Sequence, residues 1–264
     1  CLCGEMCASY NSIGAFKYLP RIGLCMGEVC PACGEEYEQL GQHWVWNENH
    51  RPELTVYQKD IITGLMMSDG TLIKCDKNPY LRVRMITKEY LEWLDDSFGI
   101  LSTGVYLDRP AEYSAKQCRD SGFRPDAKEE NYHDYWGVNT RSLPELWEWD
   151  WYTGDDGEKV WPEDIELTPT ALTHLYVGDG TWGNFECNNR ISIAASNERG
   201  NENKIDSYFE NVGLPTPNRY EERQHKDGSW RMDITFNTEE SKELWSYMND
   251  APPGFEYKFP EQYR

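Results

Sequence analysis

Two apolar segments of the chain end alike. The first runs over 62–70 and the second over 172–180, and each closes on Asp-Gly followed by a threonine. Both carry apolar residues on more than one side, which predicts two buried helices, each ending where glycine can adopt the left-handed conformation. Thr55 ahead of the first segment and Thr168-Pro169 ahead of the second are typical of helix starts. The pattern therefore predicts an internal repeat built around two similar helices.

Further matches follow in the same order in both halves of the chain. The first two are separated by 98 residues, from 139 to 237 and from 145 to 243. The matches are Asn139-Thr140 with Asn237-Thr238, Glu145-Leu146-Trp147 with Glu243-Leu244-Trp245, and Lys159 before Trp161-Pro162 with Lys258 before Phe259-Pro260. Ordered matches of this kind favour a tandem repeat over coincidence.

Between these landmarks both halves show a similar succession of hydrophobic periods. The first half predicts strands near 71–75, 80–86, 102–107 and 132–139, with helices near 87–98 and 142–149. The second half predicts strands at 182–187, 190–196, 217–224 and 229–236, with helices near 201–212 and 239–249. Each half has the order αββαββα, which indicates an α+β fold with antiparallel sheets. We expect a cysteine- and histidine-rich module over 1–52, a first repeat over 53–165 and a second over 166–264.

The chain is strongly acidic, with 26 basic and 46 acidic residues and a net charge of −20. Proteins that bind nucleic acids usually carry a basic surface, so contact with DNA would require local basic stripes. A dense acidic surface is typical of adaptation to a salt-rich cytoplasm, where charge repulsion is screened. No apolar run approaches the roughly 18 residues of a membrane span, and a secretory signal pattern is missing. We therefore expect a cytoplasmic protein of a salt-adapted prokaryote with no membrane partner.

The two repeated segments resemble the paired motifs of LAGLIDADG homing endonucleases, in the single-chain form, over residues 55–264. The resemblance implies a site-specific, intron-encoded enzyme that hydrolyses phosphodiester bonds of double-stranded DNA. It also implies that Asp69 and Asp179 hold catalytic magnesium (or manganese), with the backbone carbonyls of Ser68 and Gly178 as further candidate ligands. A carboxylate at the negative end of a helix dipole favours a bound cation, and oxygen ligands suit magnesium. A catalytically silent DNA-binding protein and an RNA maturase, which also use this fold, are the alternatives.

The resemblance assigns supporting roles to residues around the two aspartates. Lys159 and Lys258 stand at matching positions and would steady negative charge on the phosphate. Asn197 resembles the polar residue that orients water in such enzymes. His174 takes the place of a glycine in the second motif, where we expect a buried, hydrogen-bonded imidazole. Close approach of the two helices requires small residues, which are Thr63, Gly64, Ser68, Thr173 and Gly178.

For DNA recognition, the family lays two antiparallel sheets along the major groove as a saddle. In 81–85, Arg82 and Arg84 alternate with apolar residues, the pattern of a half-buried strand. Each candidate contact is a basic residue in or beside a predicted strand, and solvent-facing charge is the competing interpretation. The candidates are Lys74, Arg82, Arg84, Lys116, Arg119, Arg190, Arg219, Arg223, Lys226 and Arg231. Because one chain carries both motifs, we expect a monomer on a long pseudo-palindromic target.

Six of the nine cysteines lie in the first 33 residues, a clustering that favours metal ligation over disulfides. Cys30, Cys33, His43 and His50 nearly follow the spacing of a zinc finger, which would fold a segment too short to have its own core. A second zinc site is a candidate beside the alternative of free thiols, and its ligands would be Cys1, Cys3, Cys7 and Cys25. Such a module would either extend the DNA contact or brace the fold.

Overall fold

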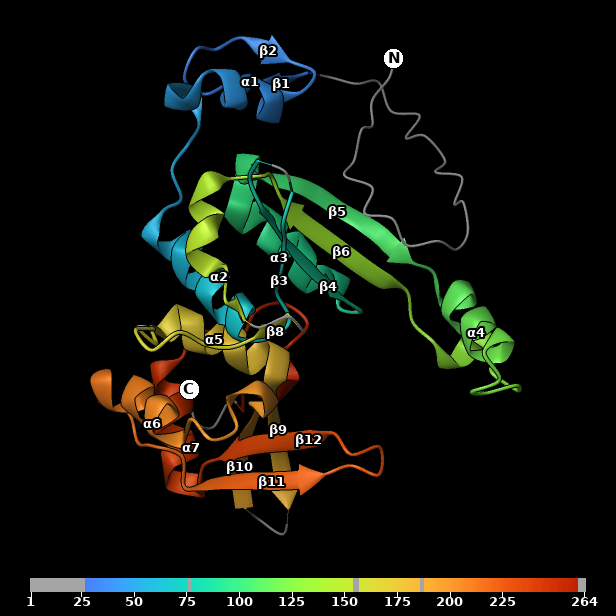
Figure 1. The fold of residues 1–264 in the computed structure, drawn as a ribbon, viewed down its shortest axis with the longest axis vertical. Coiled ribbons are helices and arrows are strands. Elements are labelled where there is room, and N and C mark those ends of the chain that lie inside the picture. The colour runs from blue at the N-terminus through green and yellow to red at the C-terminus, as the bar shows by residue number, and fades with distance from the viewer. Residues whose placement is uncertain (1–26, 76, 154–156, 186–187, 261–264) are drawn as a thin grey trace.

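The computed structural model describes residues 27–75, 77–153, 157–185 and 188–260. Two antiparallel four-stranded sheets lie on either side of a central pair of helices, α2 (Val56–Met67) and α5 (Pro169–Asp179) (Figure 1). Buried residues from both halves form one hydrophobic core. The predicted α+β fold with two similar halves is confirmed.

The first half forms a sheet with the strand order β3-β4-β6-β5. Helix α3 packs against β5 and β6 of this sheet. The elements are α2, β3 (Thr71–Ile73), β4 (Tyr80–Met85), α3 (Lys88–Phe98), β5 (Ser102–Arg109), α4 (Ala111–Asp120), β6 (Tyr135–Thr140) and the 3-10 helix η4 (Pro144–Trp149), followed by the short strands β7 (Tyr152–Thr153) and β8 (Glu158–Lys159).

The second half has the strand order β9-β10-β12-β11, which is the same order as that of the first sheet. Its elements are α5, β9 (Gly180–Phe185), β10 (Asn188–Ala194), the 3-10 helix η5 (Ser196–Glu198), α6 (Glu202–Asn211), β11 (Arg219–Gln224), β12 (Trp230–Thr235), α7 (Thr238–Tyr247) and the 3-10 helix η6 (Glu256–Lys258). The equivalent strand order shows that the sequence repeat is also a structural repeat.

Both motif helices begin at the threonines that the sequence indicates. The Thr55 side chain accepts a hydrogen bond from the Gln58 amide, and the Gln58 side chain closes a capping box on the Thr55 amide. The Thr168 side chain accepts from the Ala171 amide, and Pro169 occupies the first turn of α5, where no intrahelical donor is needed. These caps fix where each helix starts, and therefore where its far end lies.

The two motif helices touch through their backbones. A methyl group added to Gly64 would lie 2.2 Å from the carbonyl oxygen of Ala171, and one added to Gly178 would lie 2.6 Å from Oγ of Ser68. The Ser68 hydroxyl donates to the carbonyl oxygens of Gly64 (3.0 Å) and of His174 on the partner helix (3.3 Å). The predicted contact of small residues is confirmed for Gly64, Ser68 and Gly178. Thr63 and Thr173 instead bind Trp149 and the Asn249 amide.

His174 is buried and meets a tyrosine of the other repeat. Its Nδ1 lies 2.6 Å from the hydroxyl oxygen of Tyr90 on α3. Burial lowers the pKa of this imidazole to about 3, so it stays neutral at physiological pH. The prediction of a buried, hydrogen-bonded histidine is confirmed, and the bond joins the two halves.

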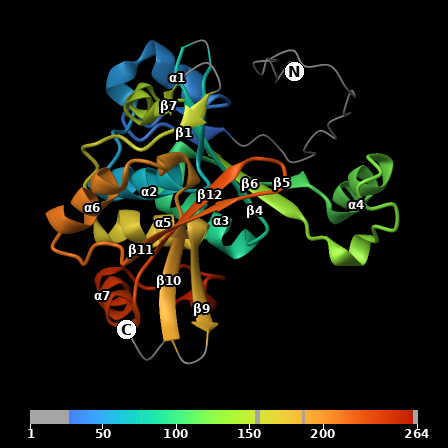
Figure 2. The ribbon, with the colours of Figure 1, turned by 60° about the horizontal axis from the view of Figure 1, so that its bottom comes forward.

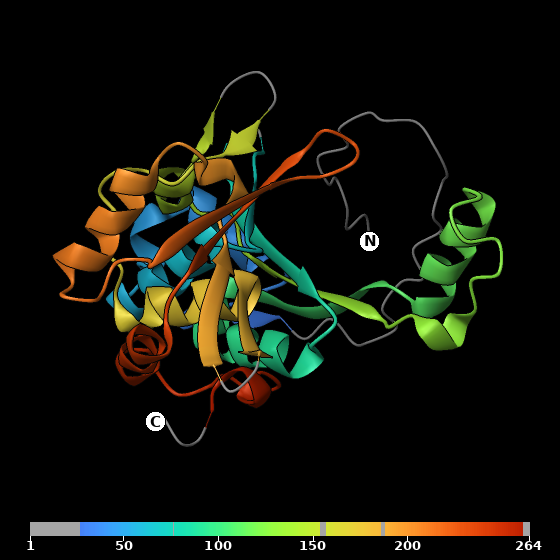
Figure 3. The same cartoon turned by 90° about the horizontal axis from the view of Figure 1, so that it is seen from below.

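Two local expectations differ from the structure. The segment between β5 and β6 contains helix α4, which the sequence pattern did not predict, and Figures 1, 2 and 3 show it held away from the body of the protein. Its only buried residue is Ala115, so it lacks the continuous apolar stripe that marks a core helix. The predicted α-helix near 142–149 is the 3-10 helix η4.

The N-terminal module lies beside the first repeat, at the end of the long axis away from the second repeat (Figure 1). It consists of β1 (Glu28–Val29), β2 (Glu36–Tyr37), α1 (Leu40–Trp46) and the 3-10 helix η1 (Glu48–His50). Arg141 of the first repeat pairs with Glu28 and lies 5.7 Å from the Trp44 ring centroid. Arg51 pairs with Glu145 at 2.9 Å. These contacts fasten the module to the repeat.

Within the described part of the chain, no helix has the length and apolar character needed to cross a membrane.

We expect Gly64→Ala to destabilise the protein, because its methyl group would meet the Ala171 carbonyl, a backbone atom that cannot rotate away. Overpacking of a core commonly costs about 1–3 kcal/mol, and contact with backbone should place this variant at the upper end. Urea unfolding followed by tryptophan fluorescence measures the loss. Gly41→Ala on α1 is the control, since its nearest neighbour would be a side-chain atom at 3.8 Å. Equal stability of Gly64→Ala and the wild type would contradict the close helix contact.

Candidate active site and metal centre

The C-terminal ends of α2 and α5 bring two carboxylates together. Asp69 is the second residue after α2, next to the C-cap Ser68, and Asp179 is the last residue of α5. A methyl group added to Gly178, the residue before Asp179, would lie 3.2 Å from Oδ2 of Asp69. The close contact of the helices therefore places the two repeated aspartates side by side.

A lysine lies at the end of each motif helix. Nζ of Lys159 donates to the carbonyl oxygens of Ser68 (2.5 Å) and Gly70 (2.9 Å). Nζ of Lys258 donates to the carbonyl oxygens of Val177 (2.7 Å) and Gly180 (2.7 Å). The terminal carbonyls of a helix lack intrahelical donors, and a cation there also faces the negative end of the dipole. The contacts with Gly70 and Gly180 match between the repeats, whereas the second contact lies one residue before the aspartate for Lys159 and two residues before it for Lys258. Lys159 thus uses the Ser68 carbonyl that the sequence offers as a metal ligand.

The pKa values of the two aspartates and two lysines are shifted in the direction that favours their neutral forms. The pKa of Asp179 is raised to about 6, first by desolvation and then by the charge of Asp69. Desolvation also raises the pKa of Asp69, although this residue keeps contact with solvent. Desolvation lowers the pKa of Lys159 to about 8 and also lowers that of Lys258, against the attraction of both aspartates. Two crowded carboxylates with oxygen donors fit a hard divalent cation, which would relieve their repulsion.

The segment that carries Lys159 is held by residues of both repeats. The Trp161 indole donates to the Met67 carbonyl (3.0 Å), and the Trp161 amide donates to Oε1 of Glu198 (2.6 Å). Glu198 is only 1% exposed and pairs with Nζ of Lys204 at 2.5 Å. The Asn197 side chain donates to the Lys159 carbonyl (3.1 Å). The pair of Glu198 and Lys204 was not identified from the sequence, because nothing local marks either residue.

Asn197 also borders the space next to the aspartates. A pocket of about 190 Å³ beside Asp179 is lined by Met67, Ser68, Lys159, Trp161, Asp179 and the 194–198 segment. The hydrogen bond to Lys159 gives Asn197 a structural contact. The predicted role in orienting water is compatible with its place at the pocket wall and remains a prediction.

The outer surface of the second sheet gathers four of the predicted DNA contacts. The strand register places Arg219, Arg223, Arg231 and Arg190 on one face of the sheet. Lys226 lies in the turn between β11 and β12, whose hairpin extends beyond the rest of the sheet (Figure 3). The second sheet therefore carries a local stripe of basic residues, which an acidic protein would require for contact with DNA.

The first sheet has fewer basic side chains on its surface. Buried and half-buried residues alternate along β4, which confirms that Arg82 and Arg84 share its outer face. Arg84 lies 3.5 Å from Asp108, and Lys74 pairs with Asp150 at 2.7 Å. Lys116 and Arg119, which were predicted to lie in or beside a strand, lie on helix α4 instead. The guanidinium group of Arg119 donates a hydrogen bond to the Ala127 carbonyl.

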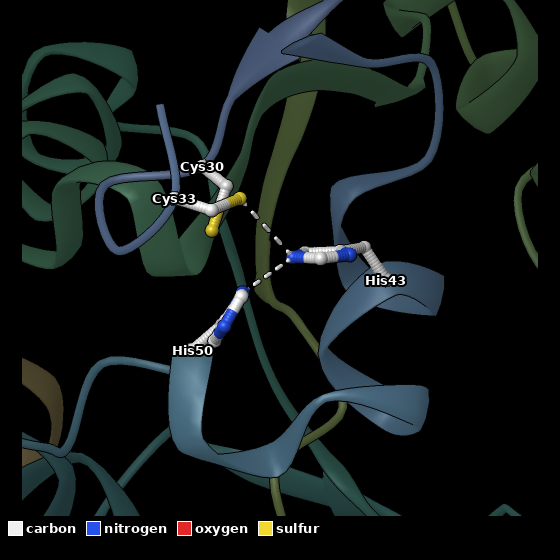
Figure 4. A group of neighbouring side chains, drawn as sticks. All are labelled: Cys30, Cys33, His43 and His50. Carbon is white, nitrogen blue, oxygen red and sulfur yellow. Dashed lines mark hydrogen bonds between the residues drawn. The ribbon is translucent and has the colours of Figure 1, made fainter. Parts of the chain in front are cut away.

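The described part of the N-terminal module brings two cysteines and two histidines together (Figure 4). The ligand atoms of Cys30, Cys33, His43 and His50 all lie within 4.8 Å of one another. Nε2 of His43 lies 3.0 Å from Nδ1 of His50 and 3.8 Å from Sγ of Cys33. Ligands about 2.0–2.3 Å from a zinc ion at tetrahedral angles have spacings of this size. The proposed second set of ligands, Cys1, Cys3, Cys7 and Cys25, lies outside the described residues.

The environment of Cys30 suits a thiolate. Burial raises the pKa of this thiol, but the backbone N–H groups of Cys33 and Ala32 beside it leave the pKa below its usual value. The Gly34 amide donates to the Cys30 carbonyl (2.8 Å), and Gly34 has φ +75°, which closes the turn between the thiols. The donor set and its support therefore fit a structural zinc ion.

We expect Asp179→Asn to stabilise the metal-free protein at pH 8 but not at pH 4. Below pH 4 the wild-type carboxyl is protonated in the folded and unfolded states, whereas above pH 6 the folded state must hold it charged. The shift sets an upper limit of about 3 kcal/mol, and solvent screening of a half-buried group reduces the expected gain to about 1 kcal/mol.

Urea unfolding in EDTA at both pH values measures this gain. Asp227→Asn is the control, because hydrogen bonds from Ser229 lower the pKa of Asp227, so that neutralisation should reduce stability at pH 8. A gain for Asp179→Asn that is the same at both pH values would show that its carboxyl is not desolvated.

Comparisons with known proteins agree with this architecture. A family model described as the LAGLIDADG DNA endonuclease family matches residues 59–244. The structure is similar to that of the homing endonuclease I-WcaI bound to its DNA recognition sequence, with a TM-score of 0.58 and 15% identity over 80% of this chain and 89% of that chain. It also resembles the N-terminal LAGLIDADG domain of DUF199/WhiA (TM-score 0.39, 9% identity, 72% and 81% coverage) and I-DmoI in complex with DNA and Mn (TM-score 0.35, 12% identity, 66% and 87% coverage).

A search among curated proteins gives no match. The family model nevertheless spans most of α2, all of α5, both four-stranded sheets and both aspartates. The chain belongs to the LAGLIDADG DNA endonuclease family.

Proposed function

We propose that the protein is a site-specific homing endonuclease that hydrolyses phosphodiester bonds of double-stranded DNA. The observation that carries this proposal is the pairing of Asp69 and Asp179 at the ends of two touching helices, each with a lysine beside it. A catalytically silent binder would have no need for two desolvated carboxylates at this point. The proposed division of the chain is 1–52, 53–165 and 166–264.

Asp69 and Asp179 are the residues that would hold magnesium or manganese. When bound, such ions activate water for attack on phosphorus and stabilise charge on the leaving oxygen. The protein contributes the position of both carboxylates, which the helix contact fixes before any ligand arrives. This preorganisation avoids rearrangement during the reaction.

Lys159 and Lys258 would contact the phosphate. An ammonium group has three N–H donors, and each of these lysines uses two of them on helix carbonyls. One donor on each lysine is left for a non-bridging phosphate oxygen. The carbonyl contacts restrict the ammonium group, so the remaining donor has a defined direction.

DNA would lie across the outer faces of the two sheets, with one half-site on each repeat and the aspartates at the centre. The repeat symmetry suits a long pseudo-palindromic target bound by a monomer. The acidic remainder of the surface opposes non-specific attraction to phosphates, so base contacts would carry much of the affinity. This balance suits a salt-rich cytoplasm, which we propose as the setting of the enzyme.

We expect the wild type to cut a plasmid library with randomised inserts when Mg²⁺ or Mn²⁺ is present, and not in EDTA. Asp69→Asn and Asp179→Asn should each slow cutting at least about 100-fold, because loss of a metal-binding carboxylate removes several kcal/mol of transition-state stabilisation. Sequencing of the cut ends measures both the rate and the preferred site. Asp60→Asn is the matched control, since this acid lies nine residues before Asp69, near the start of α2.

The alternatives give different results in the same experiment. A catalytically silent DNA-binding protein would retain plasmid DNA in Mg²⁺ without cutting it. An RNA maturase would bind structured RNA in preference to the duplex. Full activity of both aspartate variants would reject the proposed active site.

The second part of the proposal is a structural zinc ion held by Cys30, Cys33, His43 and His50. The module has few buried residues of its own, and its strands contain two residues each. A segment of this size needs a cross-link to fold stably. The ion would therefore brace the module against the first repeat.

We expect Cys33→Ser to reduce the zinc content by one ion per chain, measured by elemental analysis after gel filtration. Limited proteolysis should then cut within 27–52 before it cuts either repeat, because the module loses its cross-link. Cys118→Ser, at the end of α4, is the control and should retain the wild-type content. Unchanged zinc in Cys33→Ser would contradict the ligand assignment.

A further inference from the structure

Several arginines on the second sheet are held by carboxylates of the same face. The register places Asp233 on β12 opposite Glu221 on β11, next to the pair Arg231 and Arg223. Arg231 Nε lies 2.9 Å from Oδ1 of Asp233. Arg223 Nη2 lies 3.6 Å from Oδ2 of Asp233 and also 3.6 Å from Oε2 of Glu221 on its own strand. Each oxygen of one carboxylate therefore faces a different arginine.

Asp233 is the buried member of this group. Its side chain is 7% exposed, whereas those of Arg231 and Arg223 are 49% and 68% exposed. A buried carboxylate thus lies beneath two exposed guanidinium groups that contact it. They also border a hollow of about 520 Å³ on the outer face of the sheet, together with Arg190, Ser192 and Thr235. This hollow is the surface on which DNA would lie.

The contact with Asp233 changes what the arginines can bind. A nearby carboxylate offsets their positive charge, which weakens attraction to phosphates at any sequence. The Nε–H of Arg231 is directed at Asp233, so the two terminal amino groups remain for other acceptors. Paired donors of this kind match O6 and N7 of guanine in the major groove. The arrangement favours base contacts over phosphate contacts.

Two other arginines on the same face are not paired with a carboxylate. They are Arg219 and Arg190, which have no carboxylate partner among the residues that the structure describes. Arg219 lies on the same strand and the same face as Arg223, four residues away. The sheet therefore offers an internal comparison between a carboxylate-held arginine and an unpaired one.

We propose that Asp233 is a specificity-determining residue: it holds Arg223 and Arg231 for base contacts and limits their non-specific attraction to the DNA backbone. The proposal rests on the proposed function, because it takes double-stranded DNA as the ligand. It assigns phosphate contact to Arg219 and base contact to Arg223.

The first experiment measures binding of a mixed-sequence 30-base-pair duplex in EDTA by fluorescence anisotropy at several NaCl concentrations. Asp233→Asn keeps the shape of the side chain but removes its charge. We expect this variant to bind the duplex about tenfold more tightly at low salt, with one to two more counterions released. Glu222→Gln is the control, because it removes one charge from the opposite face of β11, where Glu222 pairs with Arg199 at 2.7 Å.

The second experiment selects bound sequences from a duplex library with a randomised central region. Asp233→Asn should weaken the base preferences of one half-site, and Glu222→Gln should leave them intact. Arg223→Gln should weaken the same preferences with little change in mixed-sequence binding. Arg219→Gln should weaken all binding and release about one counterion fewer. The exposed arginine variants test the proposal without altering a buried group.

The outcomes separate this proposal from the proposed function. If the wild type selects a sequence but Asp233→Asn keeps its selectivity and salt dependence, the role of Asp233 is rejected and the nuclease assignment stands. Equal effects of Arg223→Gln and Arg219→Gln would also reject it. If the wild type binds no duplex at all, both proposals fail.

Discussion

The structure depends on the backbone contact between α2 and α5. At Gly64 and Gly178 the two helices approach so closely that no Cβ atom fits between them. This contact sets the distance between the helix ends, and hence between Asp69 and Asp179. It also relates the two sheets, because each sheet follows directly from one motif helix. A small change in helix separation would therefore alter the proposed active site and the proposed DNA-binding surface together.

The sequence predicted the features that repeat or that follow a local period. The motif helices, their threonine caps and the alternation in β4 depend on neighbouring residues, so pattern alone identified them. Helix α4 was missed because its buried face is limited to Ala115. The pair Glu198–Lys204 was missed for a different reason: Glu198 meets Trp161, which lies 37 residues away, only in the folded chain. Polar contacts between residues that are far apart in the sequence produce no periodic pattern by which they could be predicted.

Ion pairs reconcile the acidic composition with the proposed DNA-binding surface, because they allow carboxylates to lie among the arginines of that surface. Arg84 with Asp108, and Arg231 with Asp233, place carboxylates within the basic stripes themselves. Salt screens long-range attraction to phosphates over a few ångströms at high concentration, whereas hydrogen bonds to base edges act at contact distance. A surface with partly offset arginines therefore loses less of its selectivity in salt than a uniformly basic one.

The two lysines proposed for the active site make similar contacts through different supports: each donates to the carbonyl of the glycine after the motif aspartate and to one carbonyl at the helix end. Lys159 is held from the other repeat, where Glu198 binds the Trp161 amide and Asn197 binds the Lys159 carbonyl. The carbonyl of Lys258 accepts a hydrogen bond from the hydroxyl of Tyr176, within its own repeat (2.8 Å). The supports differ, and one of the two carbonyl contacts is shifted by one residue between the repeats, yet both ammonium groups stay on the carbonyl of the glycine that follows the motif aspartate. What the two lysines share is therefore their place beside the pair of carboxylates, where the phosphate is proposed to lie.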